Sequence, residues 1–264
     1  MSNVSISTNN LTIGYEHKVV QRDLSFSLKM GEMVCMLGKN GCGKSTLLRT
    51  LAGLQPAING TFAIASGVPD DTCVVGCSSS PHHLIASTPN NNIALVLTER
   101  LSLDNTTVHD VVAMGRYPYT SFLGGLSAED EQIIAQALKD VGLVDTRYPI
   151  SETPFNAHSD GEKQRILIAK AIAQETPIIL LDEPTAHLDL PNRIKVLQLL
   201  RRLAHEQGKT ILISTHELDL AIQLSDRILL MSEHGVQLDT PAKLREQNAF
   251  THAFGMDIFN PLQH

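Results

Sequence analysis

The chain has 264 residues, of which 42% are hydrophobic, enough to bury the core of one or two domains. Its formal net charge of -7 makes it a poor general binder of nucleic acid, and no apolar run reaches the length of about 18 residues that spans a membrane. Four cysteines do not make a disulfide framework in a chain of this length, and the opening segment lacks a secretory signal, so we expect a reducing cytosol.

Strands and helices are predicted to alternate along the chain. Residues 1–35 and 60–97 have a turn-rich β pattern, interrupted by a buried strand at 34–38 that leads into a helix ending near Gly53. Residues 107–175 are predicted to be helical, with Ser127 as one N-cap. Buried strands follow at 177–184 and 210–215, with a helix at 191–206 between them. This order predicts an α/β fold with a mostly parallel sheet covered by helices.

A glycine-rich segment, GKNGCGKST, lies between the first buried strand and its helix. The spacing fits a phosphate-binding loop, in which glycines let backbone N–H groups curl around phosphates. Lys44 would reach the β- and γ-phosphates of a nucleotide and Ser45 would hold Mg²⁺, whereas an ordinary glycine turn would need neither residue. The predicted nucleotide-binding residues of this loop are Gly38, Asn40, Gly41, Cys42, Gly43, Lys44, Ser45 and Thr46.

Two carboxylates end the second buried strand, in the segment IILLDEPT. The carboxyl edge of a parallel sheet is where such folds bind ligands. Asp182 would anchor Mg²⁺ directly or through water, and Glu183 would orient or deprotonate an attacking water. An exposed acidic turn is the alternative.

Cys73, Cys77, His82 and His83 lie close together and suggest a metal site. The cysteine spacing fits half of a zinc site, but adjacent histidines rarely face one ion and no second cysteine pair follows. We favour a polar excursion between two strands over a structural metal.

Four further features complete a pattern: Tyr15 in LTIGYEH, Ser159 and Gly161 in AHSDGEKQR, Asp189 in AHLDL and His216 in ISTHELD. With them the chain resembles the ATPase subunit of ABC transporters over nearly its whole length. The resemblance implies that Tyr15 stacks on adenine, that Ser159 and Gly161 belong to the signature motif, that Asp189 lies in the loop joining two nucleotide sites, and that His216 contacts the γ-phosphate. It also implies ATP and Mg²⁺ as cofactors.

The resemblance implies a single ABC ATPase domain over 1–264. It has a P-loop NTPase core with an antiparallel β subdomain, up to about residue 98, an inserted helical signature subdomain at 99–175, and the rest of the core at 176–264. Two copies would enclose ATP, dock on integral-membrane permease subunits at the cytoplasmic face of the cell membrane, and serve a substrate-binding protein indirectly.

The segment VVAMGRYPYTSFLGGLSAED, at 111–130, is similar to ATPases that import iron siderophores, haem or cobalamin. Arg116, Tyr117 and Tyr119 are therefore candidates to contact a permease or to shape the groove beside it, since Tyr and Arg favour interfaces. Alternatively, Tyr117 and Tyr119 only pack a turn. The resemblance implies an ATP-hydrolysing subunit of a metal-chelate importer.

The chain departs from the family pattern in two motifs, and its region 61–97 is longer than usual. Thr98, beside Glu99, stands where the family usually has Gln, and either residue could take over its Mg²⁺ role. The signature, usually Leu-Ser-Gly-Gly-Gln, reads His158, Ser159, Asp160, Gly161 and Glu162. Two other functions stay open: an ABC-type protein that binds ATP with weak or no hydrolysis, and a non-transport ABC ATPase.

The spacing of Ser159 and Glu162 also predicts a capping box at the start of a helix. The free N–H groups of such a start attract an anion, so both roles can coexist. We expect Asp160 to point away from the nucleotide, because its carboxylate would repel a phosphate.

Overall fold

In the computed structural model, the described residues are 4–15, 18–65, 72–76, 92–97, 103–120, 125–143, 150–186, 188–233 and 235–255. Within these ranges, no helix is both long and apolar enough to cross a lipid bilayer. Thr98, Glu99, Cys77, His82 and His83 lie outside the described residues, as does the side chain of Cys73.

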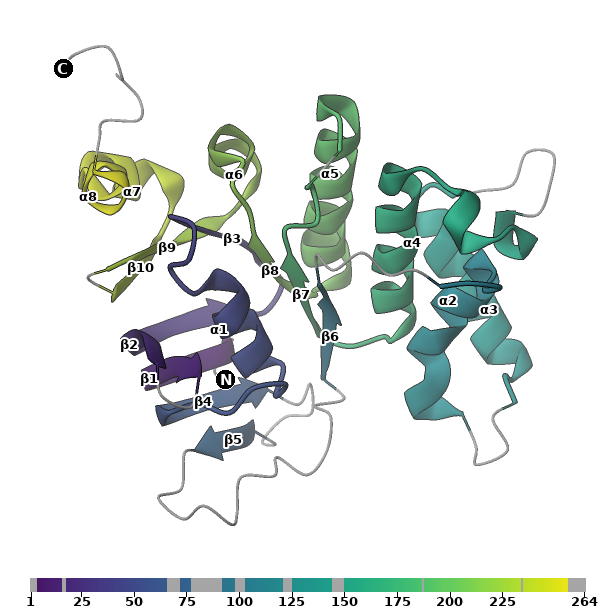
Figure 1. Ribbon diagram of the computed structural model, residues 1–264, viewed down its shortest axis with the longest axis horizontal. Helices are drawn as coiled ribbons and strands as arrows, with labels where there is room; N and C mark the ends of the chain where they lie inside the picture. Colours follow the sequence, from purple (N-terminus) through teal and green to yellow (C-terminus); the bar gives the residue numbers. More distant parts are fainter. Residues whose placement is uncertain are drawn as a thin grey trace.

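The chain runs through two sheets and a set of helices (Figure 1). The strands are β1 (Val4–Tyr15), β2 (Lys18–Lys29), β3 (Met33–Gly38), β4 (Asn59–Ala65), β5 (Thr72–Gly76), β6 (Ile93–Val96), β7 (Ile178–Asp182), β8 (Thr210–Ser214), β9 (Arg227–Ser232) and β10 (Gly235–Asp239). The α-helices are α1 (Lys44–Leu51), α2 (Val108–Ala113), α3 (Ala128–Asp140), α4 (Asp160–Ala173), α5 (Leu190–Gln207), α6 (Leu218–Leu224), α7 (Pro241–Glu246) and α8 (Ala249–Phe254). The 3₁₀ turns are η1 (Met114–Tyr119), η2 (Ile150–Glu152) and η3 (Phe155–Ala157).

The larger sheet has the strand order β10-β9-β3-β8-β7-β6. Neighbouring strands from β9 to β6 pair in parallel, and only β10 pairs antiparallel. Its central strands are buried on both faces, which explains their continuous apolar sequence. In β7, for example, Ile178 and Leu180 join one hydrophobic cluster while Ile179 and Leu181 join the other. The carboxyl ends of β3, β7 and β8 therefore meet at one edge.

The smaller sheet is antiparallel, in the order β2-β1-β4-β5. Helix α1 lies between it and the larger sheet, and Leu47, Leu48 and Leu51 are buried in the hydrophobic cluster that the two sheets share (Figure 1). Burial of apolar surface on both sides fixes the direction in which the N-terminus of α1 points.

Helices α2, α3 and α4 pack together at the end of the molecule away from the antiparallel sheet (Figure 1). Ser127 caps α3 as predicted, with its hydroxyl accepting the Asp130 N–H. The predicted fold class and the strands near 34–38, 177–184 and 210–215 are confirmed. Strands β9 and β10 and helices α6 to α8 were not predicted, and the division of the chain near residues 98 and 175 stays a prediction.

Arg116 holds the helical part together from inside. Its side chain is only 6% exposed and pairs with Asp130 at 2.8 Å and Glu175 at 2.7 Å. The guanidinium also donates to the Ala173 carbonyl and lies over the Tyr119 ring, 4.2 Å from its centroid. The charge of Arg116 is therefore paired within the protein, between η1, α3 and the end of α4, which argues against direct contact with a permease. That Arg116 shapes the groove beside a permease stays a prediction.

The two tyrosines of η1, Tyr117 and Tyr119, differ in the hydrogen bonding of their hydroxyl groups within the described part of the chain. The Tyr119 hydroxyl donates to the Gln174 carbonyl at 2.7 Å, so this residue does pack the turn, as the alternative expected. Tyr117 is 61% exposed and stays a candidate contact.

We predict that Arg116→Ala lowers the free energy of unfolding by about 3 kcal/mol, because it leaves the carboxylate of Asp130 without its buried partner. Urea denaturation measures the change. Arg22→Ala is the matched control, since Arg22 is exposed and surface changes usually stay within about 0.5 kcal/mol. Equal unfolding midpoints for the two variants would show that the Arg116 network does not stabilise the fold.

Candidate functional site

The glycine-rich loop connects β3 to α1. Gly41 and Gly43 have φ angles of 78° and 104°, in the left-handed region that side chains disfavour. Helix α1 has no acidic residue in its first turn, so the positive end of its dipole is not compensated locally. Its free N–H groups face the mouth of the loop, an arrangement suited to an anion.

Two of the loop glycines are required by close packing. A Cβ on Gly38 would lie 2.6 Å from the Met231 carbonyl oxygen and 2.7 Å from Cys42 Sγ. A Cβ on Gly43 would lie 2.8 Å from Val20 Cγ1. The loop therefore keeps its curve only with glycine at these positions.

Lys44 is buried, and its ammonium group folds back onto the loop. Nζ donates to the Gly38 carbonyl at 2.9 Å and to the Lys39 carbonyl at 3.3 Å. Asn40 and Gly41 are exposed at the tip, while Thr46 is buried in the first turn of α1. Among these residues, burial raises the pKa of the Cys42 thiol, so it stays protonated near neutral pH.

A second cluster forms where β7 and β8 end. Asp182 Oδ1 accepts a hydrogen bond from Ser45 Oγ at 3.1 Å and one from Ser214 Oγ at 2.6 Å. Ser214 was missed in the sequence analysis. It is the partner of Asp182 in the β7–β8 register. Ser214 lies near the end of the predicted strand 210–215, but its pairing with Asp182 depends on the strand order, which the sequence did not show.

Glu183 and His216 lie beside this cluster and contact one another. His216 Nε2 is 2.5 Å from Glu183 Oε1, and the two side chains are 44% and 31% exposed. Glu183 has a φ angle of 48°, and its N–H donates to both the carbonyl and the hydroxyl of Ser214. A non-glycine residue in this region is strained by roughly 1–3 kcal/mol, a feature that gathers at functional sites.

The predicted capping box at α4 is confirmed. Ser159 Oγ accepts the Glu162 N–H at 3.4 Å and donates to Glu162 Oε2 at 2.8 Å, and the Ser159 N–H donates to the same carboxylate at 3.0 Å. The hydrogen bonds from Ser159 lower the pKa of Glu162. His158 is held nearby, with Nε2 2.7 Å from Thr153 Oγ1.

Gly161 lies beside the start of α5. A Cβ there would meet Asn192 Nδ2 and Leu188 Cδ2 at 3.5 Å, an ordinary contact. Asp189 is the N-cap of α5 and accepts the Asn192 N–H at 3.2 Å. Asp160 is exposed and makes no hydrogen bond or ion pair within the described part of the chain. The N-termini of α4 and α5 thus form a second group, separate from the loop.

Tyr15 ends β1 and is 54% exposed. Gln55, from the segment after α1, donates to the carbonyl of Gly14 and so fixes the backbone just before Tyr15. The sequence analysis did not single out Gln55, because a single glutamine belongs to no recognisable motif.

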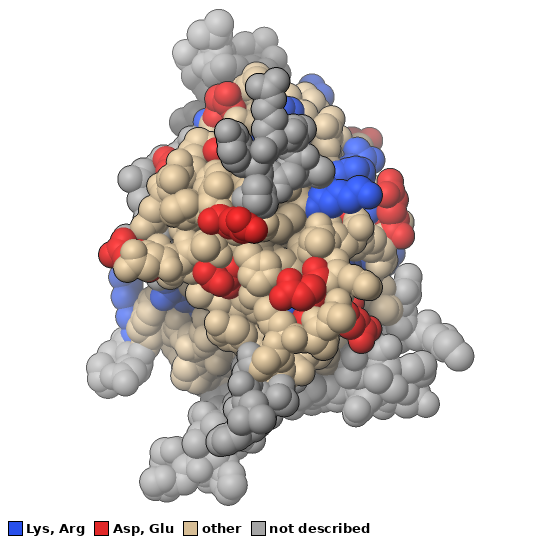
Figure 2. All heavy atoms as spheres, turned by 90° about the vertical axis from the view of Figure 1, so that its right-hand side faces the viewer, with Lys and Arg blue, Asp and Glu red and all other residues tan. Residues whose placement is uncertain are grey.

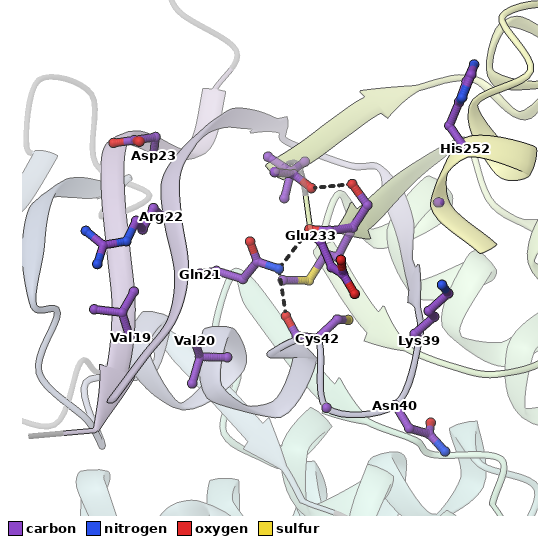
Figure 3. A pocket seen from close by; sticks show the side chains of 16 residues that line it. Val19, Val20, Gln21, Arg22, Asp23, Lys39, Asn40, Cys42, Glu233 and His252 are labelled. Atoms are coloured by element: carbon purple, nitrogen blue, oxygen red, sulfur yellow. Dashed lines mark hydrogen bonds between the residues drawn. The ribbon is translucent and has the colours of Figure 1, made fainter. Parts of the chain in front are cut away.

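A hollow of about 870 Å³ lies on the other side of the loop, between β2, the β9–β10 turn and α8 (Figure 3). Gln21 crosses it, donating to the Cys42 carbonyl at 3.1 Å and the Ser232 carbonyl at 2.9 Å (Figure 3). The loop lines the hollow only from Lys39 to Cys42, and Tyr15, Lys44, Ser45 and the two carboxylates do not. Gln21 therefore supports the loop from behind.

Comparisons with known proteins agree with this geometry. A family model described as "ABC transporter" matches residues 21–186. The iron(3+)-hydroxamate import ATP-binding protein FhuC of Bacillus subtilis is 35% identical over 229 residues, covering 87% of this chain and 79% of that protein.

Two solved structures are similar over most of the chain. A metal-chelate type ABC transporter in an inward-facing conformation matches with a TM-score of 0.79 and 30% identity, covering 96% of this chain and 90% of that chain. The dimeric structure of MJ0796, a bacterial ABC transporter cassette, matches with a TM-score of 0.70 and 25% identity, covering 89% and 98%. The resemblance inferred from the sequence is confirmed: this chain belongs to the ABC transporter family, as one of its ATP-binding proteins.

Proposed function

We propose that the chain hydrolyses ATP to drive the import of a metal chelate such as an iron siderophore, haem or cobalamin. One observation carries the proposal: the glycine-rich loop and the two carboxylates meet at one edge of the sheet. Ser45 of the loop donates to Asp182, and the neighbouring Glu183 contacts His216. The printed names of the relatives, which concern iron-hydroxamate import and metal-chelate transport, support this class of cargo.

In this proposal the triphosphate lies over the N-terminus of α1. Backbone N–H groups from Asn40 to Thr46 bind the phosphates, and Lys44 exchanges a loop carbonyl for a phosphate oxygen. Tyr15, exposed at the end of β1, stacks on the adenine.

Ser45 and Asp182 fit Mg²⁺, because they present hydroxyl and carboxylate oxygens to each other at 3.1 Å. When bound, the ion neutralises charge on the phosphates. Thr98 is a third proposed ligand.

In the proposed hydrolysis, Glu183 and His216 have separate roles. The Glu183 carboxylate orients the attacking water and accepts its proton. The water oxygen bonds to the γ-phosphorus while the bond to the β-phosphate oxygen breaks, giving ADP and phosphate. His216, which now contacts Glu183, turns its Nε2–H toward the γ-phosphate.

We propose that a second copy completes the site. Ser159 and the Gly161 N–H of one copy would contact the γ-phosphate held by the other copy's loop, with Asp189 in the joint between the two sites. The dimeric MJ0796 cassette supports this arrangement by similarity. Asp160, exposed and unpaired among the described residues, can turn away from the phosphate.

We propose that the dimer docks on membrane permease subunits at the cytoplasmic face of the membrane, with Tyr117 as a contact, and serves a substrate-binding protein indirectly. The acidic signature residue Glu162 favours one alternative, an ATP-binding protein with weak hydrolysis, since its carboxylate stands close to the proposed γ-phosphate contact. Measuring phosphate release by the parent chain separates the two.

We predict that Glu183→Gln slows ATP hydrolysis by about 100-fold or more, because the amide cannot accept the proton. ATP would stay trapped, so a sizing column should show a stable ATP-dependent dimer. Lys44→Ala is the contrasting variant, which should neither bind ATP nor dimerise. Hydrolysis by Glu183→Gln at the parent rate would contradict the assigned role.

We predict that Gly43→Ala weakens ATP binding by about tenfold or more, because the left-handed φ angle and the contact with Val20 force the loop to shift. Titration with a fluorescent ATP analogue measures this. Gly53→Ala is the control: Gly53 has a φ angle of 76° but no atom within 4 Å of its Cβ position, at the other end of α1. An equal loss of affinity in both variants would show that the loop curve does not matter.

We predict that Gly161→Asp abolishes hydrolysis while ATP binding to the loop is retained, since the new carboxylate repels the partner's γ-phosphate. Gly161→Ala controls for bulk, because its Cβ makes only ordinary contacts. Asp160→Gly should change the rate by less than about fivefold. Normal phosphate release by Gly161→Asp would mean that α4 does not complete the site.

A further inference from the structure

A groove of about 1050 Å³ lies between the end of α3, the middle of α4 and one face of α5. Five of its fourteen lining residues are Lys or Arg, against 21 Lys and Arg among the 264 residues of an acidic chain. These five, Lys139, Arg165, Lys195, Arg201 and Arg202, define what we call the α5 groove. It shares no residue with the nucleotide site.

The positive charge of the α5 groove is poorly compensated. Lys139, Lys195 and Arg201 make no ion pair or side-chain hydrogen bond with any residue that the structure describes. Among the lining residues that the structure describes, two are carboxylates, Asp140 and Glu206. Like charges gathered without partners repel one another and destabilise the folded chain, so an anion that neutralises them would stabilise it.

The two remaining arginines, Arg165 and Arg202, have N–H groups that make only long hydrogen bonds or none among the described residues. Arg165 Nη1 reaches the Val141 and Gly142 carbonyls only at 3.5 Å, and its Nε is buried with no hydrogen-bond partner among the described residues. Arg202 likewise bonds the Asp140 carbonyl only at 3.5 Å. A buried unpaired N–H is costly, and guanidinium groups bind phosphate in a bidentate manner.

The spacing of the charges favours a ligand with more than one anionic group. Lys195 and Arg202 are seven residues apart on one face of α5, about 10 Å along the helix axis, so linked phosphate groups can contact more of the basic side chains than a single phosphate can. Figure 2 looks onto the neighbouring helical end of the molecule, where carboxylates (red) spread across the middle of the face and Lys and Arg (blue) lie toward its edges.

We propose that the α5 groove binds a small oligophosphate, that is, a free molecule with two or more linked phosphate groups. Its volume is of the size that small-ligand sites have. The ligand bridges α3 and α4 on one side and α5 on the other. This proposal does not depend on ATP hydrolysis, because no residue that lines the α5 groove belongs to the nucleotide site.

The test is calorimetric titration of the full chain with sodium tripolyphosphate, in a Lys44→Ala background that weakens phosphate binding at the loop. The groove variant is Lys195→Gln with Arg201→Gln. The matched control, Lys29→Gln with Lys243→Gln, removes the same charge from exposed positions elsewhere. We expect the groove variant to bind tripolyphosphate about tenfold more weakly than the control, through loss of charge-assisted hydrogen bonds.

Two further measurements sharpen the outcome. Tripolyphosphate should raise the unfolding temperature of the control variant and not that of the groove variant. Citrate and a hexaglutamate peptide are titrated in parallel. Equal tripolyphosphate affinity in the two variants, no binding to either, or tighter binding of citrate or hexaglutamate to the control would each overturn the proposal. Binding that persists equally in both variants would lie outside the α5 groove, and because the groove shares no residue with the nucleotide site, such a failure leaves the proposed function untouched.

Discussion

One carboxylate oxygen, Oδ1 of Asp182, holds the functional edge of this protein together. It accepts one hydrogen bond from the first turn of α1, through Ser45, and one from the end of β8, through Ser214. Hydrogen bonds to a charged acceptor are each worth about 1.5–3 kcal/mol. The loop therefore keeps a fixed position relative to the central strands, and Glu183, the next residue, is held by Ser214 in a backbone conformation that would otherwise relax.

A second set of shared polar contacts lies at the helical end, around Arg116. Arg116 is buried, yet its charge is matched by Asp130 and Glu175, and its Nη1 also donates to the Ala173 carbonyl. Loss of Arg116 would leave the buried carboxylate of Asp130 without its charged partner. Rigid contacts at both ends leave the exposed side chains, Tyr15 and Tyr117 among them, as the parts free to meet a ligand or a partner.

The sequence predicted features that repeat or follow fixed spacing, and it failed where a single side chain decides. The glycine-rich loop, the carboxylates after a buried strand and the box at Ser159 were all found from spacing. Ser214 was missed, because its role exists only through the pairing of two strands distant in the sequence. Arg116 was misjudged, since arginine is usually exposed and its burial depends on Glu175, a residue far along the chain. Strands β9 and β10 carry no motif and were not predicted.

The box at the start of α4 also restricts how this chain can change over evolutionary time. Ser159 and Glu162 each satisfy the backbone N–H of the other. Losing either side chain alone leaves an N–H group at the helix start without its partner and costs about 1 kcal/mol, so descendants that change one position first pass through a weakened helix. The two positions are therefore coupled: as long as Ser159 is kept, residue 162 needs a side chain, Glu or Gln, whose oxygen can accept the Ser159 N–H.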